Sequence, residues 1–256
     1  MSFHGTPCWF ELATSDLDAA KSFYGAVFGW KTSDSVMPDF EYRLASAGKD
    51  MVAGMMPLEM CPEGVPPNWL VYFAVDNCEA AAMDVAEAGG HVLQEPTVIP
   101  RTGQFAVLAD PQGAVFGILE PEPMDTPPEG GAWDQRAAGH GNWLELMSTD
   151  PQAGMAFYCR LLGWAPDQAM DMGAMGKYHL FTHHGAQIGG MMGLGPAPVP
   201  NWLPYFGVDD VAAAIKAIRS NGGTLSHGPV EVPGPALICV AQDPQGAWFA
   251  IVGPKP

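Results

Sequence analysis

The chain has 256 residues, of which 11 are basic and 28 acidic, so its formal net charge is −17, and 48% of the residues are hydrophobic. The apolar content excludes a disordered chain, and the acidic balance without any Lys/Arg cluster excludes the usual means of binding nucleic acid or anionic membranes. Five widely spaced cysteines without a CxxC motif indicate neither a disulfide framework nor a zinc knuckle. The start has no basic region followed by an apolar run, so we expect a cytoplasmic protein.

The predicted elements begin with a strand, since "WFELAT" at 9–14 alternates between apolar and polar residues. Ser15 or Asp16 can cap a following helix, and Gly29 can end it. The apolar residues of that helix share one face, namely Leu17, Ala20, Tyr24, Val27 and Phe28. Short strands are expected near 30–35, 41–47 and 51–57, then a strand at 70–75, a helix over 77–88 and further strands, of which the last two flank a "DPQG" turn.

The sequence contains this pattern of motifs twice. "SFYGAVFGW" at 22–30 parallels "AFYCRLLGW" at 156–164, "PNWLVYFAVD" at 67–76 parallels "PNWLPYFGVD" at 200–209, and "DPQG" recurs. The copies keep their order at an offset of about 133 to 136 residues, which indicates a duplicated domain. We expect domains at 1–120 and 139–256, joined by a Pro-, Gly- and acid-rich linker at 121–138. Each domain is a pair of β-α-β-β-β units, and the fold class is α+β.

This layout resembles the vicinal oxygen chelate superfamily, which includes glyoxalase I, bleomycin-resistance proteins and extradiol dioxygenases. The resemblance covers nearly the whole chain twice, on the F-Y…G-W openings and the later V-D…G-G…DP-x-G pattern. It implies that each domain forms a half-open, mixed-sheet barrel with a cavity. It implies no single activity, because one fold hosts several functions.

Metal-using members of that superfamily place His, Glu or Gln ligands on set strands, and the resemblance carries those positions onto apolar residues here. In the first half these residues are Trp9, Leu70 and Gly117, and in the second half Trp143, Leu203 and Ala250. None offers an imidazole or carboxylate, which a divalent metal needs. We therefore expect no metal site of the usual kind and no cofactor, while a divalent metal at a non-standard site stays open.

Strand alternation selects the residues that would line each cavity. If Trp9 and Trp143 face inward, so do Glu11 and Glu145, and if Leu70 and Leu203 do, so do Tyr72 and Tyr205. Met56 and Met192 lie on the neighbouring strands. The predicted catalytic residues are Glu11 with Tyr72 and Glu145 with Tyr205, and the predicted ligand-binding residues are Trp9, Leu70, Met56, Trp143, Leu203 and Met192. A structural role for the glutamates stays open, and the histidines of "KYHLFTHHG" at 177–185 are expected at the surface.

Three functions are compatible with these residues. The first is a metal-independent binding protein for a small apolar or aromatic molecule. The second is a glyoxalase-like lyase, isomerase or hydroxylase-type enzyme that uses the Glu/Tyr pairs or an atypical metal site. The third is a scaffold whose barrels are filled by Met and Trp side chains. The only partner expected besides the small molecule is another copy, since the chain is either a monomer with an internal pseudo-dimer or a homodimer.

Overall fold

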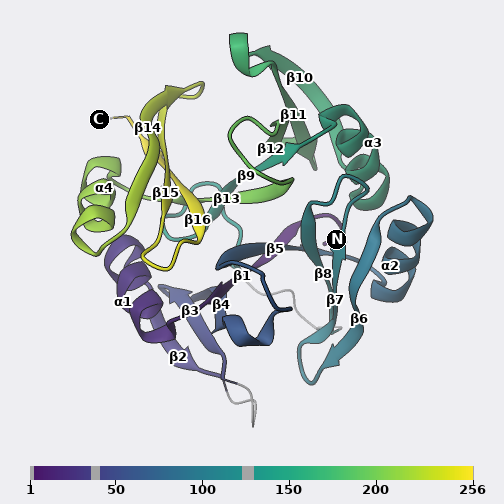
Figure 1. The fold of residues 1–256 in the computed structure, drawn as a ribbon, viewed down its shortest axis with the longest axis horizontal. Coiled ribbons are helices and arrows are strands. Elements are labelled where there is room, and N and C mark those ends of the chain that lie inside the picture. Colours follow the sequence, from purple (N-terminus) through teal and green to yellow (C-terminus); the bar gives the residue numbers. More distant parts are fainter. Residues whose placement is uncertain (1–2, 36–40, 123–129, 256) are drawn as a thin grey trace. The chain divides into compact units, whose positions relative to one another are not determined.

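A computed structural model describes residues 3–35, 41–122 and 130–255. The described residues of the first half form eight strands in one mixed sheet, in the order β2-β3-β4-β1-β5-β8-β7-β6 (Figure 1). The strands are β1 (Pro7–Thr14), β2 (Lys31–Asp34), β3 (Arg43–Ala47), β4 (Asp50–Pro57), β5 (Asn68–Ala74), β6 (His91–Ile99), β7 (Gly103–Ala109) and β8 (Val115–Pro121).

The second half repeats this sheet with the order β10-β11-β12-β9-β13-β16-β15-β14. Its strands are β9 (Gly141–Ser148), β10 (Ala165–Asp171), β11 (Lys177–His183), β12 (Ala186–Gly193), β13 (Asn201–Gly207), β14 (Thr224–Val232), β15 (Ala236–Gln242) and β16 (Trp248–Pro254). The expected α+β class and the duplicated eight-stranded mixed sheets are therefore confirmed.

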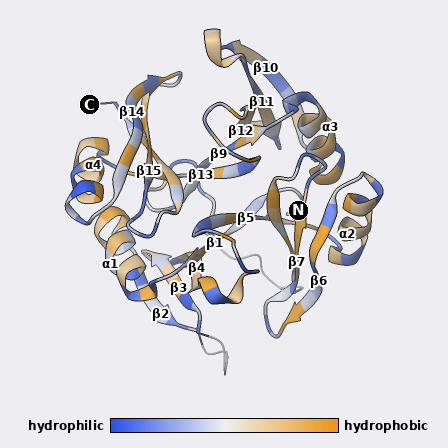
Figure 2. Ribbon diagram, in the orientation of Figure 1, coloured by the Kyte–Doolittle hydropathy of each residue, from blue (hydrophilic) through white to orange (hydrophobic). Residues whose placement is uncertain are grey.

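Four helices complete the described fold, and their ends follow the capping residues in the sequence. They are α1 (Leu17–Phe28), α2 (Cys78–Glu87), α3 (Pro151–Leu162) and α4 (Val211–Ser220), with short 3₁₀ turns at Leu58–Met60 and Gly173–Met175. Asp16 caps α1, because its carboxylate accepts a hydrogen bond from the Ala19 amide at 2.9 Å. Gly29 ends α1 with a φ of 71°, a left-handed conformation that favours glycine. Hydrophobic and hydrophilic residues are interspersed along the helices and strands (Figure 2).

The chain divides into two compact units, and each unit contains segments from both halves of the sequence. Unit 1 comprises Met1–Cys8, Val71–Pro128 and Leu144–Trp202, and unit 2 comprises Trp9–Leu70, Glu129–Trp143 and Leu203–Pro256. Helices α2 and α3 pack together in unit 1, and α1 and α4 pack side by side in unit 2 (Figure 1). Within each compact unit, a β-α-β-β-β segment of the first half of the sequence therefore packs against a β-α-β-β-β segment of the second half.

The core of each unit is a cluster of aromatic side chains drawn from both halves. Unit 2 contains Phe10, Tyr24, Phe28, Trp30, Trp69, Phe206 and Phe249, with neighbouring ring centroids between 4.9 and 6.0 Å apart. Unit 1 contains a similar cluster made of Phe73, Phe116, Phe157, Tyr158, Trp164, Phe181 and Trp202. The repeated Phe-Tyr…Gly-Trp phrase supplies the central members of both clusters. Such aromatic cores dominate the apolar surface that folding removes from water.

A chain of two hydrogen bonds runs through the core of unit 2. The Trp69 indole N–H donates to the Tyr24 hydroxyl at 2.9 Å, and that hydroxyl donates to Asp243 Oδ2 at 2.9 Å. Asp243 opens the second DPQG turn, where its Oδ1 also accepts the Ala247 amide at 2.9 Å. Burial, followed by the charge of Asp243, raises the pKa of Tyr24 well above its usual value, so the hydroxyl keeps its proton and remains the donor.

Unit 1 repeats this Trp-Tyr-Asp relay. Trp202 donates to the Tyr158 hydroxyl at 3.0 Å, and Tyr158 donates to Asp110 Oδ2 at 3.1 Å. Each relay joins a helix of one half to a DPQG turn of the other. The DPQG tetrapeptides are turns as expected, since Gly113 donates to the Asp110 carbonyl at 2.9 Å, but they also hold the two halves together.

Candidate ligand-binding site

The strand β1 divides its side chains between a fully buried face and a partly exposed one. Phe10 and Leu12 have no exposed surface, whereas Trp9 and Glu11 on the opposite face are partly exposed. A carboxylate and an indole that point away from the core and still reach solvent are groups that a ligand can contact. The expected alternation is seen from Trp9 to Leu12, whereas Ala13 is buried, and the cavity-lining role of Trp9 and Glu11 stays a prediction.

Trp9 and Glu11 are joined through a third residue, Tyr42, which immediately precedes β3. The Trp9 indole N–H donates to the Tyr42 hydroxyl at 3.0 Å, and this hydroxyl donates to Glu11 Oε2 at 2.8 Å. Burial, followed by the negative charge of Glu11, raises the pKa of Tyr42 well above its usual value. Tyr42 therefore stays protonated and holds the Glu11 carboxylate in one orientation.

The neighbouring strand β4 makes room for this arrangement. Gly54 lies opposite Glu11 in the parallel pairing of β1 with β4, and Met56 lies opposite Ala13. A Cβ at position 54 would fall 1.8 Å from the Tyr42 hydroxyl oxygen, so only glycine lets Tyr42 lie across the strand. Trp9, Glu11, Tyr42 and Met56 together form what we call the ligand face of unit 2.

Cys61 lies close enough to the ligand face for the charge of Glu11 to affect its pKa. It follows the 3₁₀ turn and is partly exposed. Burial, and then the charge of Glu11, raises the pKa of the Cys61 thiol, so the thiol is favoured over the thiolate. The polar groups of the ligand face are thus the Glu11 carboxylate and the Tyr42 phenol, and the neutral thiol of Cys61 lies near them.

Unit 1 carries a matching set on β9, β11 and β12. Gly190 lies opposite Glu145, and Met192 lies opposite Met147, in the parallel pairing of β12 with β9. Tyr178 covers Gly190 as Tyr42 covers Gly54, because a Cβ at position 190 would lie 2.1 Å from the Tyr178 ring. Glu145 and Met192 are partly exposed, so they parallel Glu11 and Met56.

The other expected site residues are distributed between the two units. Tyr72 is in unit 1 with Glu145, and Tyr205 is in unit 2 with Glu11. Both tyrosines are buried, at 4% and 3% exposure. The expected pairs Glu11–Tyr72 and Glu145–Tyr205 each have members in different units, and their catalytic roles stay predictions. Of the remaining expected ligand-binding residues, Leu203 is buried and Leu70 and Trp143 are partly exposed.

Tyr42 and Tyr178 were missed by the sequence reasoning. The available signal was the duplication, because "EYRLAS" at 41–46 and "KYHLFT" at 177–182 place a tyrosine at the same point of both copies. One histidine of the second segment, His183, needs a correction, whereas His184 is exposed as expected. His183 is 9% exposed instead of lying at the surface, and its Nε2 is 3.2 Å from the Thr6 hydroxyl.

The residues present do not fit the divalent metal that metal-using relatives hold. The carried-over positions Trp9, Leu70 and Gly117 in the first half offer no imidazole or carboxylate, and neither do their counterparts in the second. Gly117 lies opposite Tyr72 in the pairing of β5 with β8, and a Cβ there would be 2.2 Å from the Tyr72 ring. Within the described residues no group of three or more His, Cys, Asp or Glu side chains could hold a metal ion.

Comparisons with known proteins place this geometry in a family. The model of the Glyoxalase/Bleomycin resistance protein/Dioxygenase superfamily matches residues 8–118 and again 140–251. The chain belongs to this superfamily. The resemblance inferred from the repeated motifs is therefore confirmed. Among the described residues no helix is long and apolar enough to cross a membrane.

Relatives in the superfamily carry different names. "Putative glyoxylase CFP32" of Mycobacterium tuberculosis is 33% identical over 256 residues, covering 98% of this chain and 96% of that protein. "Anthracycline biosynthesis protein DauV" of a Streptomyces species is 30% identical over 264 residues, covering 97% and 93%. The crystal structure of a Mn(II)-bound glyoxalase from Novosphingobium aromaticivorans superposes with a TM-score of 0.68 at 16% identity, covering 99% of this chain and 83% of that one.

Proposed function

We propose that this protein binds a small, largely apolar or aromatic molecule that carries a hydroxyl or amino group, and that it does so on the ligand face of unit 2. The observation that supports this most directly is the Trp9–Tyr42–Glu11 relay. It presents a partly exposed indole beside a carboxylate whose direction is fixed by Tyr42. The indole offers a flat apolar surface, and the carboxylate accepts a hydrogen bond from the ligand.

The buried relays of the core provide an internal contrast. Trp69, Tyr24 and Asp243 form the same Trp-to-Tyr-to-carboxylate order, and Trp69 and Tyr24 have at most 5% exposure. The relay of the core is thus buried along its whole length. The Trp9–Tyr42–Glu11 relay differs because both of its ends reach solvent, which favours a role in binding over a purely structural one.

The name of one relative agrees with an aromatic ligand, but the names do not identify a ligand for this chain. One relative is named for the biosynthesis of an anthracycline, a polycyclic aromatic class, and another is named a glyoxylase. The enzymatic alternative keeps Glu11 as a general base or acid beside a tyrosine. A glyoxalase turnover assay with and without added Ni²⁺ or Zn²⁺ tests that alternative, and metal-dependent turnover would overturn a metal-independent binding role.

The binding proposal is tested by calorimetry with 1-naphthol and naphthalene as matched probes, which differ by one hydroxyl. The wild type should bind 1-naphthol at least tenfold more tightly, since a hydrogen bond to a charged acceptor contributes about 1.5–3 kcal/mol. Glu11→Gln and Tyr42→Phe should reduce this preference. Equal binding of both probes by the wild type would overturn the proposal.

The structural alternative for Glu11 has a separate readout. If Glu11→Gln lowers the melting temperature and leaves the preference for 1-naphthol unchanged, the carboxylate supports the fold and does not contact the ligand. Glu145→Gln is the matched control, because it removes the equivalent carboxylate of unit 1. An equal effect of both substitutions would show that both units bind the probe.

A further inference from the structure

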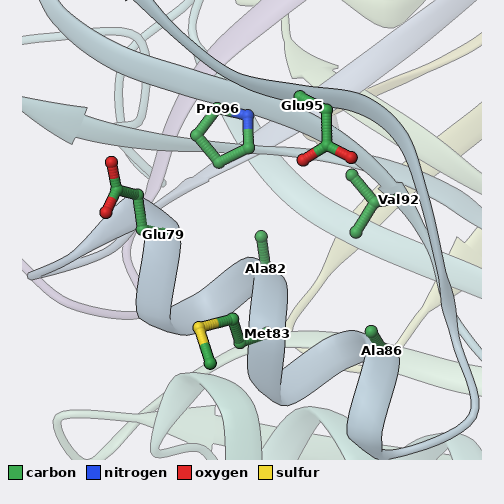
Figure 3. Close-up of a pocket in the computed structure, with 7 residues that line it drawn as sticks. All are labelled: Glu79, Ala82, Met83, Ala86, Val92, Glu95 and Pro96. Carbon is green, nitrogen blue, oxygen red and sulfur yellow. The ribbon is translucent and has the colours of Figure 1, made fainter.

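A groove lies between helix α2 and strand β6 in unit 1. Its volume is about 390 Å³, and it is lined by Glu79, Ala82, Met83, Ala86, Val92, Glu95 and Pro96 (Figure 3). The lining is mostly apolar, and the Met83 side chain is 65% exposed. Two carboxylates flank this apolar surface, one from the first turn of α2 and one from β6.

The equivalents of α2 and β6 in the second half of the sequence are α4 and β14, which belong to unit 2. The charged side chains at the equivalent positions are basic instead of acidic. At an offset of 133 residues the seven lining positions become Ala212, Ile215, Lys216, Arg219, Leu225, Gly228 and Pro229. Both glutamates are replaced by uncharged residues, and the positions of Met83 and Ala86 carry Lys216 and Arg219. One surface of the chain is therefore acidic and apolar, and its counterpart is basic and apolar.

The four charged side chains are available for contacts with another molecule. Glu79, Glu95, Lys216 and Arg219 are all exposed. None of them forms an ion pair within the described residues, where the pairs involve other side chains such as Arg43 and Lys255. Lys216 and Arg219 are three residues apart on α4, so they project from the same side of the helix.

We propose that the α2–β6 groove receives the α4–β14 surface of a second copy of this chain. We choose a second copy as the partner because the charges of the two surfaces are complementary. The chain has only 11 basic residues, and two of them, Lys216 and Arg219, stand where the groove has Met83 and Ala86. Lys and Arg stems can lie along the apolar groove while their charged ends meet the two glutamates. The net charge of −17 opposes the approach of two copies, and 0.15 M salt screens that repulsion beyond about 8 Å.

Sedimentation equilibrium in 0.15 M NaCl, over a range of protein concentrations, tests the proposal with two charge-reversed variants. Variant A is Glu79→Lys with Glu95→Lys, and variant B is Lys216→Glu with Arg219→Glu. The wild type should self-associate reversibly, and each variant alone should do so at least tenfold more weakly, because its two surfaces then carry the same sign. An equimolar mixture of A and B should recover association, since the reversed groove of A matches the reversed helix of B.

The control is Glu59→Lys with Glu63→Lys, which changes the net charge as variant A does but at exposed residues outside the groove. This control should associate at least as strongly as the wild type. A monomeric wild type at every concentration would overturn the proposal, and so would variants that associate like the wild type or a mixture that stays monomeric. Circular dichroism of each variant verifies that the fold is retained.

Discussion

Replacing Tyr24 with Phe tests whether the buried relay of unit 2 stabilises the fold. The substitution keeps the ring but removes the hydroxyl that accepts from Trp69 at 2.9 Å and donates to Asp243 at 2.9 Å. An indole N–H and a buried carboxylate oxygen each lose a partner, at about 1–3 kcal/mol apiece. We expect Tyr24→Phe to lower the free energy of unfolding by about 2–6 kcal/mol, measured by urea denaturation followed by tryptophan fluorescence.

Two further variants make this prediction refutable. Tyr158→Phe removes the equivalent hydroxyl of unit 1 and should have a similar effect. Asp243→Asn should lower the free energy of unfolding less in the Tyr24→Phe background than in the wild type. In the wild type the substitution removes the acceptor of the Tyr24 hydroxyl, whereas in the Tyr24→Phe background that hydroxyl is absent. A loss below about 1 kcal/mol for Tyr24→Phe, or strictly additive effects in the double variant, would show that the relay does not stabilise the fold as reasoned.

Two other substitutions have expected outcomes. Burial, and then the charges of neighbouring histidines, lowers the pKa of His183 to about 4. As the pH falls, the unfolded chain therefore binds a proton at this histidine before the folded chain does. The free energy of unfolding should fall between about pH 6.5 and about pH 4, by at most about 3 kcal/mol. His183→Gln should flatten this dependence in urea denaturation across that pH range, and unchanged curves would contradict it. Gly54→Ala places a Cβ 1.8 Å from the Tyr42 hydroxyl and should destabilise by about 1–3 kcal/mol, whereas Gly193→Ala, with no atom within 4 Å, is the control.

The local elements were predictable because their signals are local. A helix capped at Asp16 and ended at Gly29 was expected and is α1 (Leu17–Phe28). The helix expected at 77–88 is α2 (Cys78–Glu87), and the strands expected near 30–35, 41–47 and 51–57 are β2, β3 and β4. Capping residues and apolar periodicity act within one or two turns of chain, so they can be read without knowing the tertiary contacts.

The contacts between distant residues were not predictable in this way. Tyr24 and Asp243 are 219 positions apart, and no periodicity links a helical tyrosine to a turn of the other half. From the sequence, Asp243 was interpreted only as the first residue of a turn, and that interpretation is right. Aspartate is common at this position of a turn, so nothing in the local sequence indicated a second role. Tyr42 was missed for a related reason, since its partner Glu11 is 31 positions away on another strand.

Gly117 shows why a metal ligand does not fit on β8 without a further change. The superfamily resemblance makes this position one where metal-using relatives carry a ligand, and the Tyr72 ring covers it here. A glutamate at 117 would begin with a Cβ 2.2 Å from that ring, so ring and ligand cannot both stay in place. Accommodating a glutamate would therefore require a second change, such as Tyr72→Gly, and Gly117→Glu alone should unfold or distort β8.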